Sequence, residues 1–381
     1  MKSFVSIVFI FLIAFVSTVF AQHEGIERHF NEYSIEEHIF ENDFYSADTL
    51  TDNFHQFYSE YPFYFSTGNM ALPAHPAFFA DFKQTHDFIF YEGYTNFVYD
   101  LDNAKFFDAR KPFTRIKYVG GVKKLDDISF VHTQNVKPWF NIGAEYRSVN
   151  SEGHYANQQL KAHAAHLFSD YRKNRYWGHF DLVYNKINHQ ENGGIESDSI
   201  FRLNVQRPAN LGVNLHTATV RLGNIGARYR HNIKLGAGYN DTIIVEKDSL
   251  PIKRYPSRFS IGQDLSFNKY HRVYDDIPSS FYQNIFLDSV ATHDSLGVLM
   301  FNHGLYLQYN LAGLNNKFPN AIIRLEFLNE IKLYSIGAFV HDPFVRLSTY
   351  GLENKHDWRF AFAYCFADVH LGEFYLDADY K

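Results

Sequence analysis

Short stretches in which apolar and polar residues alternate run through the chain from about Tyr61 to its end, separated by Gly, Asn, Asp and Pro. In the clearest one, residues 227–240, one face is apolar and the other is polar. The apolar face reads Ala227, Tyr229, His231, Ile233, Leu235, Ala237 and Tyr239, and the polar face reads Arg228, Arg230, Asn232, Lys234, Gly236, Gly238 and Asn240. A period of two predicts a β-strand with one face in each of two environments, and places Leu235 and Lys234 on opposite faces.

About eleven segments share this pattern, which predicts an all-β fold. Besides residues 227–240 they are 114–120, 140–147, 157–168, 176–185, 217–224, 258–268, 301–311, 321–330, 358–366 and 369–380. In the clearest strand, Tyr229 and Tyr239 are ten residues apart. That is roughly 33 Å along a strand, or about 23 Å across a membrane at a tilt of about 45°, close to the apolar band of an outer-membrane barrel.

Alternation alone also fits a soluble antiparallel sandwich with one buried face. The aromatic content favours a barrel, because Phe and Tyr number 39 and 27 and aromatic residues make up 18% of the chain. Girdles of aromatic side chains at the two membrane interfaces explain such an excess, although a carbohydrate-binding surface is a rival explanation. A mean hydropathy of −0.31 is compatible with membrane insertion through strands.

The N-terminal residues predict export. Lys2 precedes an apolar run from Phe4 to Phe20, and Ala21 is a small residue at a plausible cleavage point, so residues 1–21 are expected to be a signal peptide. An uncleaved signal anchor is the alternative. Residues 22–60 carry ten acidic residues against one basic residue, Arg28, and are expected to be an acidic periplasmic segment, with the barrel in residues 61–381. No later apolar stretch is long enough for a membrane helix.

Charge and chemistry exclude several function classes. With 36 basic and 42 acidic residues, the chain lacks the basic excess of a nucleic-acid-binding protein. Cys365 is its one cysteine, so no internal disulfide is expected. The sequence has no Gly-x-Ser-x-Gly elbow, no His-Glu-x-x-His helix and no phosphate-binding Gly-rich loop, which predicts no enzyme and no cofactor. His163 and His166 lie three apart, so in a strand they face opposite sides and are not expected to share a metal ion.

Charged residues on the polar faces of the predicted strands are the candidates for lining a lumen. They are Glu145, Arg147, Asp181, Arg228, Arg230, Lys234, Arg324, Glu326 and Arg359. Their mixed signs predict weak ion preference, since rings of like charge are what select ions. Arg228, Arg230 and Lys234 form a local cationic run that could favour anionic solutes; solvated charges without a selectivity role are the more ordinary interpretation.

Residues 112–195 resemble the putative porin family of Bacteroidetes bacteria. The resemblance is carried by Pro112-Phe113-Thr114, Tyr118, Gly120-Gly121, His132-Thr133-Gln134-Asn135, Asn141, Gly143, Gly153-His154-Tyr155-Ala156-Asn157-Gln158, Tyr171, Arg175-Tyr176 and Glu191-Asn192-Gly193-Gly194-Ile195, and it continues upstream in Tyr61-Pro62 and Gly68-Asn69. It implies an outer-membrane barrel that passes small solutes, and supplies no catalytic residues. The chain stops at Tyr380-Lys381 rather than on an aromatic residue, and the segment count is odd, so the barrel is expected to be incomplete at its C-terminus.

The sequence therefore predicts a transmembrane antiparallel up-and-down β-barrel in the outer membrane of a Gram-negative bacterium, acting as a porin for passive diffusion. A structural or receptor barrel with a closed lumen is the first alternative, and a secreted all-β carbohydrate-active protein is the second. The expected partners are outer-membrane lipid and small hydrophilic solutes, together with further copies of the chain if the barrel is a homo-oligomer, and not nucleic acid.

Overall fold

The computed structural model describes most of the chain from residue 112 onward and shorter stretches before it. The described residues are 29–33, 45–46, 64–68, 72–76, 88–101, 106–109, 112–137, 139–197, 207–236, 239–245, 248–254, 259–277, 292–310, 320–353, 356–366 and 371–380. The expected signal peptide, residues 1–21, lies outside them, as does most of the acidic segment 22–60.

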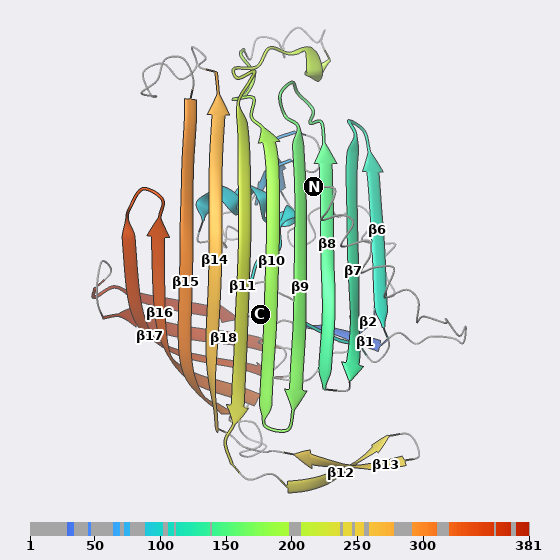
Figure 1. Cartoon of the computed structure of the whole chain (residues 1–381), viewed down its shortest axis with the longest axis vertical. Coiled ribbons are helices and arrows are strands. Elements are labelled where there is room, and N and C mark those ends of the chain that lie inside the picture. Colours follow the sequence, from blue (N-terminus) through green and yellow to red (C-terminus); the bar gives the residue numbers. More distant parts are fainter. Residues whose placement is uncertain are drawn as a thin grey trace.

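One antiparallel sheet of twelve strands dominates the described part of the chain (Figure 1). Its strands are β6 (Phe113–Gly121), β7 (Leu125–Lys137), β8 (Phe140–Ser151), β9 (Leu160–Lys173), β10 (Tyr176–Gln190), β11 (Thr219–Lys234), β14 (Phe259–Asp276), β15 (Thr292–Asn310), β16 (Asn320–Tyr334), β17 (Phe339–Glu353), β18 (His356–Cys365) and β19 (Phe374–Tyr380). Each strand pairs with its neighbours in sequence, except that the hairpin of β12 (Tyr239–Val245) and β13 (Asp248–Arg254) interrupts the order between β11 and β14. The all-β, up-and-down barrel fold expected from the sequence is confirmed, with twelve strands instead of about eleven segments.

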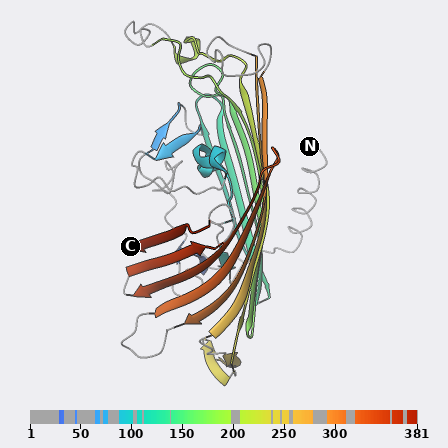
Figure 2. The same ribbon diagram turned by 90° about the vertical axis from the view of Figure 1, so that its left-hand side faces the viewer.

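The sheet is strongly curved, and its C-terminal strands sweep round toward the inner side (Figure 2). We call the inner side the concave face and the outer side the convex face. Strands β6 and β19 are the two edges, and the described residues contain no pairing between them.

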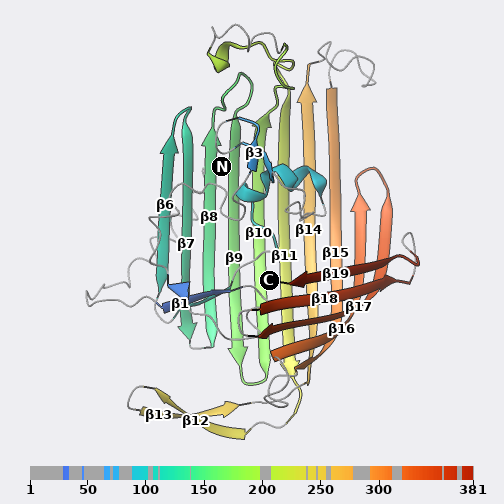
Figure 3. The ribbon, with the colours of Figure 1, turned by 180° about the vertical axis from the view of Figure 1, so that it is seen from behind.

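The described residues before β6 lie on the concave side of the sheet, where Figure 3 shows them in front of the strands. Short strands β1 (His29–Tyr33), β2 (Tyr45–Ser46) and β5 (Phe106–Ala109) form one small sheet, and β3 (Tyr64–Ser66) pairs with β4 (Ala74–Pro76). The 3₁₀ helix η2 (Ile89–Phe97) follows, and a second short 3₁₀ helix, η4 (Pro208–Asn210), lies in the loop between β10 and β11. Residues 88–101, which contain η2, are called the inner segment below.

The aromatic residues of the inner segment explain its position. Phe88, Tyr91, Tyr94 and Phe97 recur every third residue, and a 3₁₀ helix has three residues per turn, so all four lie along one face. That face is buried: the four side chains are between 1% and 7% exposed.

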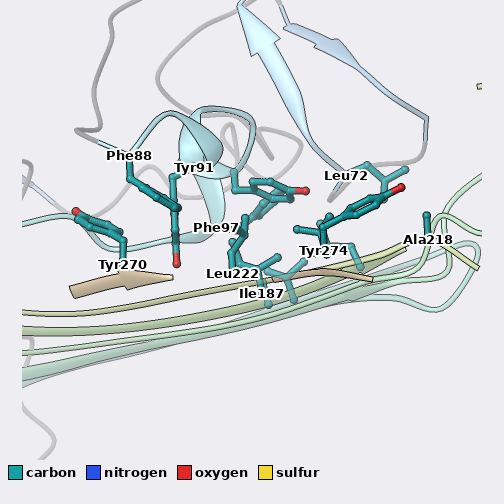
Figure 4. Packing of buried hydrophobic residues seen from close by; sticks show 14 of the residues in the cluster. Leu72, Phe88, Tyr91, Phe97, Ile187, Ala218, Leu222, Tyr270 and Tyr274 are labelled. Carbon is teal, nitrogen blue, oxygen red and sulfur yellow. The ribbon is translucent and has the colours of Figure 1, made fainter. Parts of the chain in front are cut away.

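The sheet presents an apolar surface to this face (Figure 4). The buried cluster includes Leu72 and, from the concave side of the sheet, Leu125, Val149, Leu160, Ala162, Ile187, Val220, Leu222, Tyr270, Tyr274, Val298 and Met300. Phe88 stacks on Tyr270 with ring centroids 5.4 Å apart. The main hydrophobic core therefore lies between the inner segment and one end of the sheet, the end at which β6, β8 and β10 finish.

No helix in the described residues is both long and apolar enough to cross a membrane.

Candidate functional site on the concave face

The two faces of the sheet differ in the way expected for a barrel in lipid. On the convex face, large apolar side chains in the middle of the strands are 37–50% exposed. They include Tyr146, Leu167, Phe180, Tyr184, Ile225, Tyr229, Ile261, Phe267, Phe301, Leu305, Leu307, Leu325, Phe327, Leu347 and Phe362. Charged and amide side chains instead occupy the concave face, where many are buried. A water-soluble sheet protein would bury the first set and expose the second.

Five titratable side chains on strands β8, β9 and β10 form a continuous chain, the His–carboxylate cluster: Glu145, His166, Asp181, His179 and Asp170. Asp181 Oδ1 accepts hydrogen bonds from His166 Nε2 at 3.0 Å and from His179 Nε2 at 2.9 Å. The other ring nitrogens lie 3.5 Å from Glu145 Oε2 and from Asp170 Oδ1, respectively. All five side chains are at most 9% exposed.

Strand register brings this cluster together. Glu145 lies directly opposite His166, and Asp170 directly opposite His179. Asp181 lies two residues along β10 from His179, on the same face. Ionised carboxylates only accept hydrogen bonds, so each imidazole carries a proton on Nε2 where it meets Asp181.

Basic and polar neighbours complete the cluster. Arg230, opposite His179 on β11, places Nη2 3.3 Å from Asp181 Oδ2. Asp170 accepts hydrogen bonds from Arg172 Nε at 2.7 Å and from Trp177 Nε1 at 2.8 Å. Buried charges are costly unless they are paired in this way.

Further ion pairs continue across the concave face toward the C-terminal strands. Arg228 Nε donates to Asp264 Oδ1 at 2.9 Å, and Arg346 Nε donates to Glu326 Oε2 at 3.1 Å. Arg324 reaches Gln308 Oε1 at 3.1 Å, and its guanidinium lies over the Tyr306 ring, 4.3 Å from the centroid. These three arginines are therefore close to acceptors or an aromatic ring.

Arg147 and Arg228 also hold the inner segment. Arg147 donates to both carboxylate oxygens of Asp127, at 2.9 and 2.8 Å, and to the backbone carbonyl of Asn96. Arg228 Nη1 lies 3.4 Å from the carbonyl oxygen of Leu101. Each guanidinium thus joins a carboxylate on the sheet to the inner segment.

Uncharged side chains add to this attachment. Asn185 accepts a hydrogen bond from the backbone N–H of Tyr99 at 2.9 Å and donates to the carbonyl of the same residue at 2.8 Å. The Tyr94 hydroxyl lies 2.8 Å from His189 Nδ1. Burial raises the pKa of the Tyr94 phenol far above its ordinary value, so the phenol remains protonated and can donate to the ring nitrogen. Alternation over residues 176–185 indicated the face of Asn185, but that segment ends before His189, and alternation gave no sign of these partners.

The structure places seven of the nine sequence-predicted residues on the concave face: Glu145, Arg147, Asp181, Arg228, Arg230, Arg324 and Glu326. Lys234 is the last residue of β11 and is exposed, away from the others. Arg359 lies on β18, opposite Tyr350, but its side chain is outside the described residues.

The cationic run expected at Arg228, Arg230 and Lys234 does not form a free positive patch. Arg228 and Arg230 are neutralised by Asp264 and Asp181, which come from other strands. The sequence near Arg228 and Arg230 does not reveal Asp264 and Asp181 as their partners, because the register between strands determines these contacts and the distance along the sequence does not.

The concave face can bind and orient polar groups, but it shows no assembly for metal chemistry. Within the described ranges, no group of three or more His, Cys, Asp or Glu side chains could hold a metal ion. His163 and His166 face opposite sides of β9: the first is exposed and bonds to Tyr146, and the second is buried in the cluster.

A family model described as a putative porin matches residues 29–363. Among solved structures, the crystal structure of the ferric citrate transporter FecA in the unliganded form is similar with a TM-score of 0.31 and 9% sequence identity, over 66% of this chain and 43% of that chain. The chain thus spans less than half the length of that transporter. No curated protein matches it.

Proposed function

The chain belongs to the putative porin family, and from this premise we propose that it forms an outer-membrane barrel through which small hydrophilic solutes diffuse passively. The role needs no cofactor and no covalent chemistry. A porin family supports transport rather than catalysis.

The observation that carries the proposal is the contrast between the two faces. Phe180, Leu305 and Leu325 on the convex face are 41–50% exposed, while Asp181 and Glu326 on the concave face are at most 2% exposed. Burial of the charges together with exposure of the apolar side chains is stable when lipid covers the convex face. The polar concave face is then the natural path for a hydrated solute.

Charge pairing on this path supports weak ion selectivity. Selective pores carry rings of one sign, whereas here Asp181 faces Arg230, Asp264 faces Arg228 and Glu326 faces Arg346. The nine residues predicted from the sequence are proposed to line the lumen, with Lys234 at its rim.

The inner segment supports a narrowed lumen. It covers the concave face at one end with Phe88, Tyr91, Tyr94 and Phe97. It also contacts the His–carboxylate cluster, since the ring centroids of Tyr99 and His166 are 5.8 Å apart. Because the inner segment occupies part of the lumen, it reduces the size of the solutes that can pass.

A barrel with a closed lumen, structural or receptor in role, is the second candidate. The tight apolar packing of the inner segment on the sheet favours it specifically. The number of strands does not decide between an open and a closed lumen. Side chains fill the interior of a barrel of about 8 strands, and barrels of 16 to 18 strands enclose an aqueous channel, whereas this sheet has twelve strands.

Planar bilayers with the purified full-length chain test the proposal. Discrete conductance steps with little preference between small cations and anions are expected. Reproducible absence of steps, from protein that has folded, would overturn passive diffusion and favour the closed barrel.

Fractionation of cells tests the location separately. The protein is expected in the outer-membrane fraction and should resist extraction by high salt or carbonate. Recovery in the periplasm or the medium would instead favour a secreted carbohydrate-active protein.

A further inference from the structure

The convex face carries a group of basic residues at one border of its apolar band. Lys161 and His163 come from β9, Lys186 from β10, and Lys269 and His271 from β14. All five are exposed. We call these five residues the cationic belt.

Strand register places the belt on adjacent rungs. Lys186 lies directly opposite His163 on one side and Gly223 on the other, and Gly223 lies opposite His271. Neighbouring strands are about 4.8 Å apart, so the belt extends over three strand spacings, roughly 14 Å.

Gly223 brings the two ends of the belt closer. A Cβ at this position would lie 1.9 Å from Cε1 of His271, so the imidazole occupies the space that a side chain on β11 would fill. The ring therefore lies over β11, between β14 and Lys186 on β10. A larger residue at Gly223 would push His271 away from the lysine.

The lysines have no acidic partner on this surface. Among the residues that the structure describes, Lys161, Lys186 and Lys269 form no ion pair. Two carboxylates at this end of the convex face are engaged elsewhere: Asp126 accepts a hydrogen bond from Tyr118, and Asp275 pairs with Arg221 and His293.

The belt lies where lipid headgroups meet the barrel. Lys269 is opposite Ile225, which is opposite Tyr184, and both of the latter are exposed on the apolar band. The Tyr146 ring stacks on His163 and its hydroxyl lies 3.0 Å from Nδ1. Tyrosines at this border are typical of the membrane interface, and lysines just beyond it can extend to the headgroups.

The lengths of the connections between strands indicate in which leaflet of the membrane the cationic belt lies. The belt is at the end that carries the long loops 191–218 and 277–291. At the opposite end, three of the five connections have two residues each, 138–139, 174–175 and 354–355. The other two are longer: 311–319 has nine residues, and 235–258 contains the β12–β13 hairpin. Outer-membrane barrels have short periplasmic turns and longer extracellular loops, which places the belt in the outer leaflet.

We propose that the cationic belt binds the phosphate groups of the phosphorylated glycolipid that forms the outer leaflet of the outer membrane. Three unpaired ammonium groups complement the phosphates, and the two imidazoles supply hydrogen-bond donors beside them. The inference rests on the outer-membrane placement and is independent of solute passage.

Native mass spectrometry of the full chain in detergent, titrated with diphosphoryl lipid A, tests the proposal. A retained lipid adduct is expected. The triple variant Lys161→Gln, Lys186→Gln, Lys269→Gln should bind about 100-fold more weakly, from about fivefold per lysine near a charged lipid surface. The control Lys137→Gln, Lys173→Gln, Lys234→Gln removes three exposed lysines at the other end and should bind as the native chain does.

Two further arms identify the ligand. Phosphatidylglycerol should bind far more weakly than lipid A, and millimolar inorganic phosphate should not displace lipid A. Equal binding of lipid A by both triple variants, equal binding of phosphatidylglycerol, or displacement by free phosphate would each overturn the proposal. Heat-modified migration in gels confirms that every variant has folded, and membrane fractionation of the same variants reports the outer-membrane placement separately.

Discussion

At the scale of single residues, Asp181 is the centre of the concave face. Its carboxylate is 0% exposed and lies within hydrogen-bond distance of His166, His179 and Arg230. A buried ion pair adds little net stability compared with apolar residues of the same shape, but removing one partner leaves an uncompensated charge. The cluster is therefore sensitive to any change that breaks its charge balance.

Asp181→Asn is expected to lower the free energy of unfolding by about 3 to 5 kcal/mol, because Arg230 then remains buried without a counter-charge. Equilibrium unfolding in guanidinium, followed by tryptophan fluorescence, measures the change. Asp275→Asn is the control, since this carboxylate is exposed on the convex side and its loss should cost at most about 1 kcal/mol. Equal effects of the two substitutions would contradict the central role of Asp181.

Alternation predicted which face a residue occupies, and it did so for Glu145, Asp181 and Arg230 because a strand has a strict period of two. It could not predict partners. Arg228 meets Asp264 across the β11–β14 pair, 36 positions along the chain, and Arg147 reaches the backbone of Asn96, 51 positions away. Such contacts depend on register and on a segment that is not part of the sheet.

At the scale of elements, the inner segment departs from the alternating pattern of the strands. Alternation predicts one barrel over residues 61–381, whereas residues 89–97 form a 3₁₀ helix on the concave face. A signal was present in Phe88, Tyr91, Tyr94 and Phe97, whose spacing of three fits neither a strand nor an α-helix. Reading that spacing would have predicted a short helix with one buried face.

Asn185→Ala should loosen the inner segment, because it removes both hydrogen bonds to the backbone of Tyr99. Two such bonds contribute roughly 2 kcal/mol, which corresponds to about a 30-fold shift toward the undocked segment. Single-channel recording should show larger or more frequent open states. Asn188→Ala, on the convex face of the same strand, is the matched control and should behave as the native chain; indistinguishable currents in the two variants would argue against a segment that narrows the lumen.

The free-energy cost of placing an arginine on the convex face should depend on its depth within the apolar band. Leu305 lies near the middle of the band, and Leu305→Arg should cost about 2 to 4 kcal/mol of folding free energy in lipid vesicles. Leu235 follows the last residue of β11 and bonds to Phe259 at the border, so Leu235→Arg should cost only about 0 to 1 kcal/mol. The structure thus moves Leu235 from the expected strand interior to the membrane interface.

Denaturant titration of the two variants measures the difference. A face exposed to water would tolerate both arginines, and a protein core would reject both. Either result would contradict a lipid-covered convex face.

At the scale of the whole molecule, the edges of the sheet determine how it can exist in lipid. Strands β6 and β19 each present a row of backbone N–H and C=O groups, and such groups need partners in a membrane. Twelve strands in up-and-down order place β6 and β19 in opposite directions, as antiparallel pairing requires. An even strand number is also the rule for bacterial barrels.

The even number of described strands removes the odd segment count as an argument for an incomplete barrel, and pairing of β6 with β19 would close the sheet within one chain. In a Cys365→Ser background, Ile116→Cys on β6 and Leu376→Cys on β19, both exposed on their strands, should be joined by a short bifunctional thiol reagent in the membrane. The product should have the mass of one chain and the altered mobility of an internal loop, because the two edges approach each other in the same molecule. A product with the mass of two chains would show that the edges pair between copies, and the barrel would then be an assembly of subunits. The pair Ile116→Cys and Leu305→Cys serves as control, since β15 lies inside the sheet with neighbours β14 and β16 on both sides and should give no cross-link with β6.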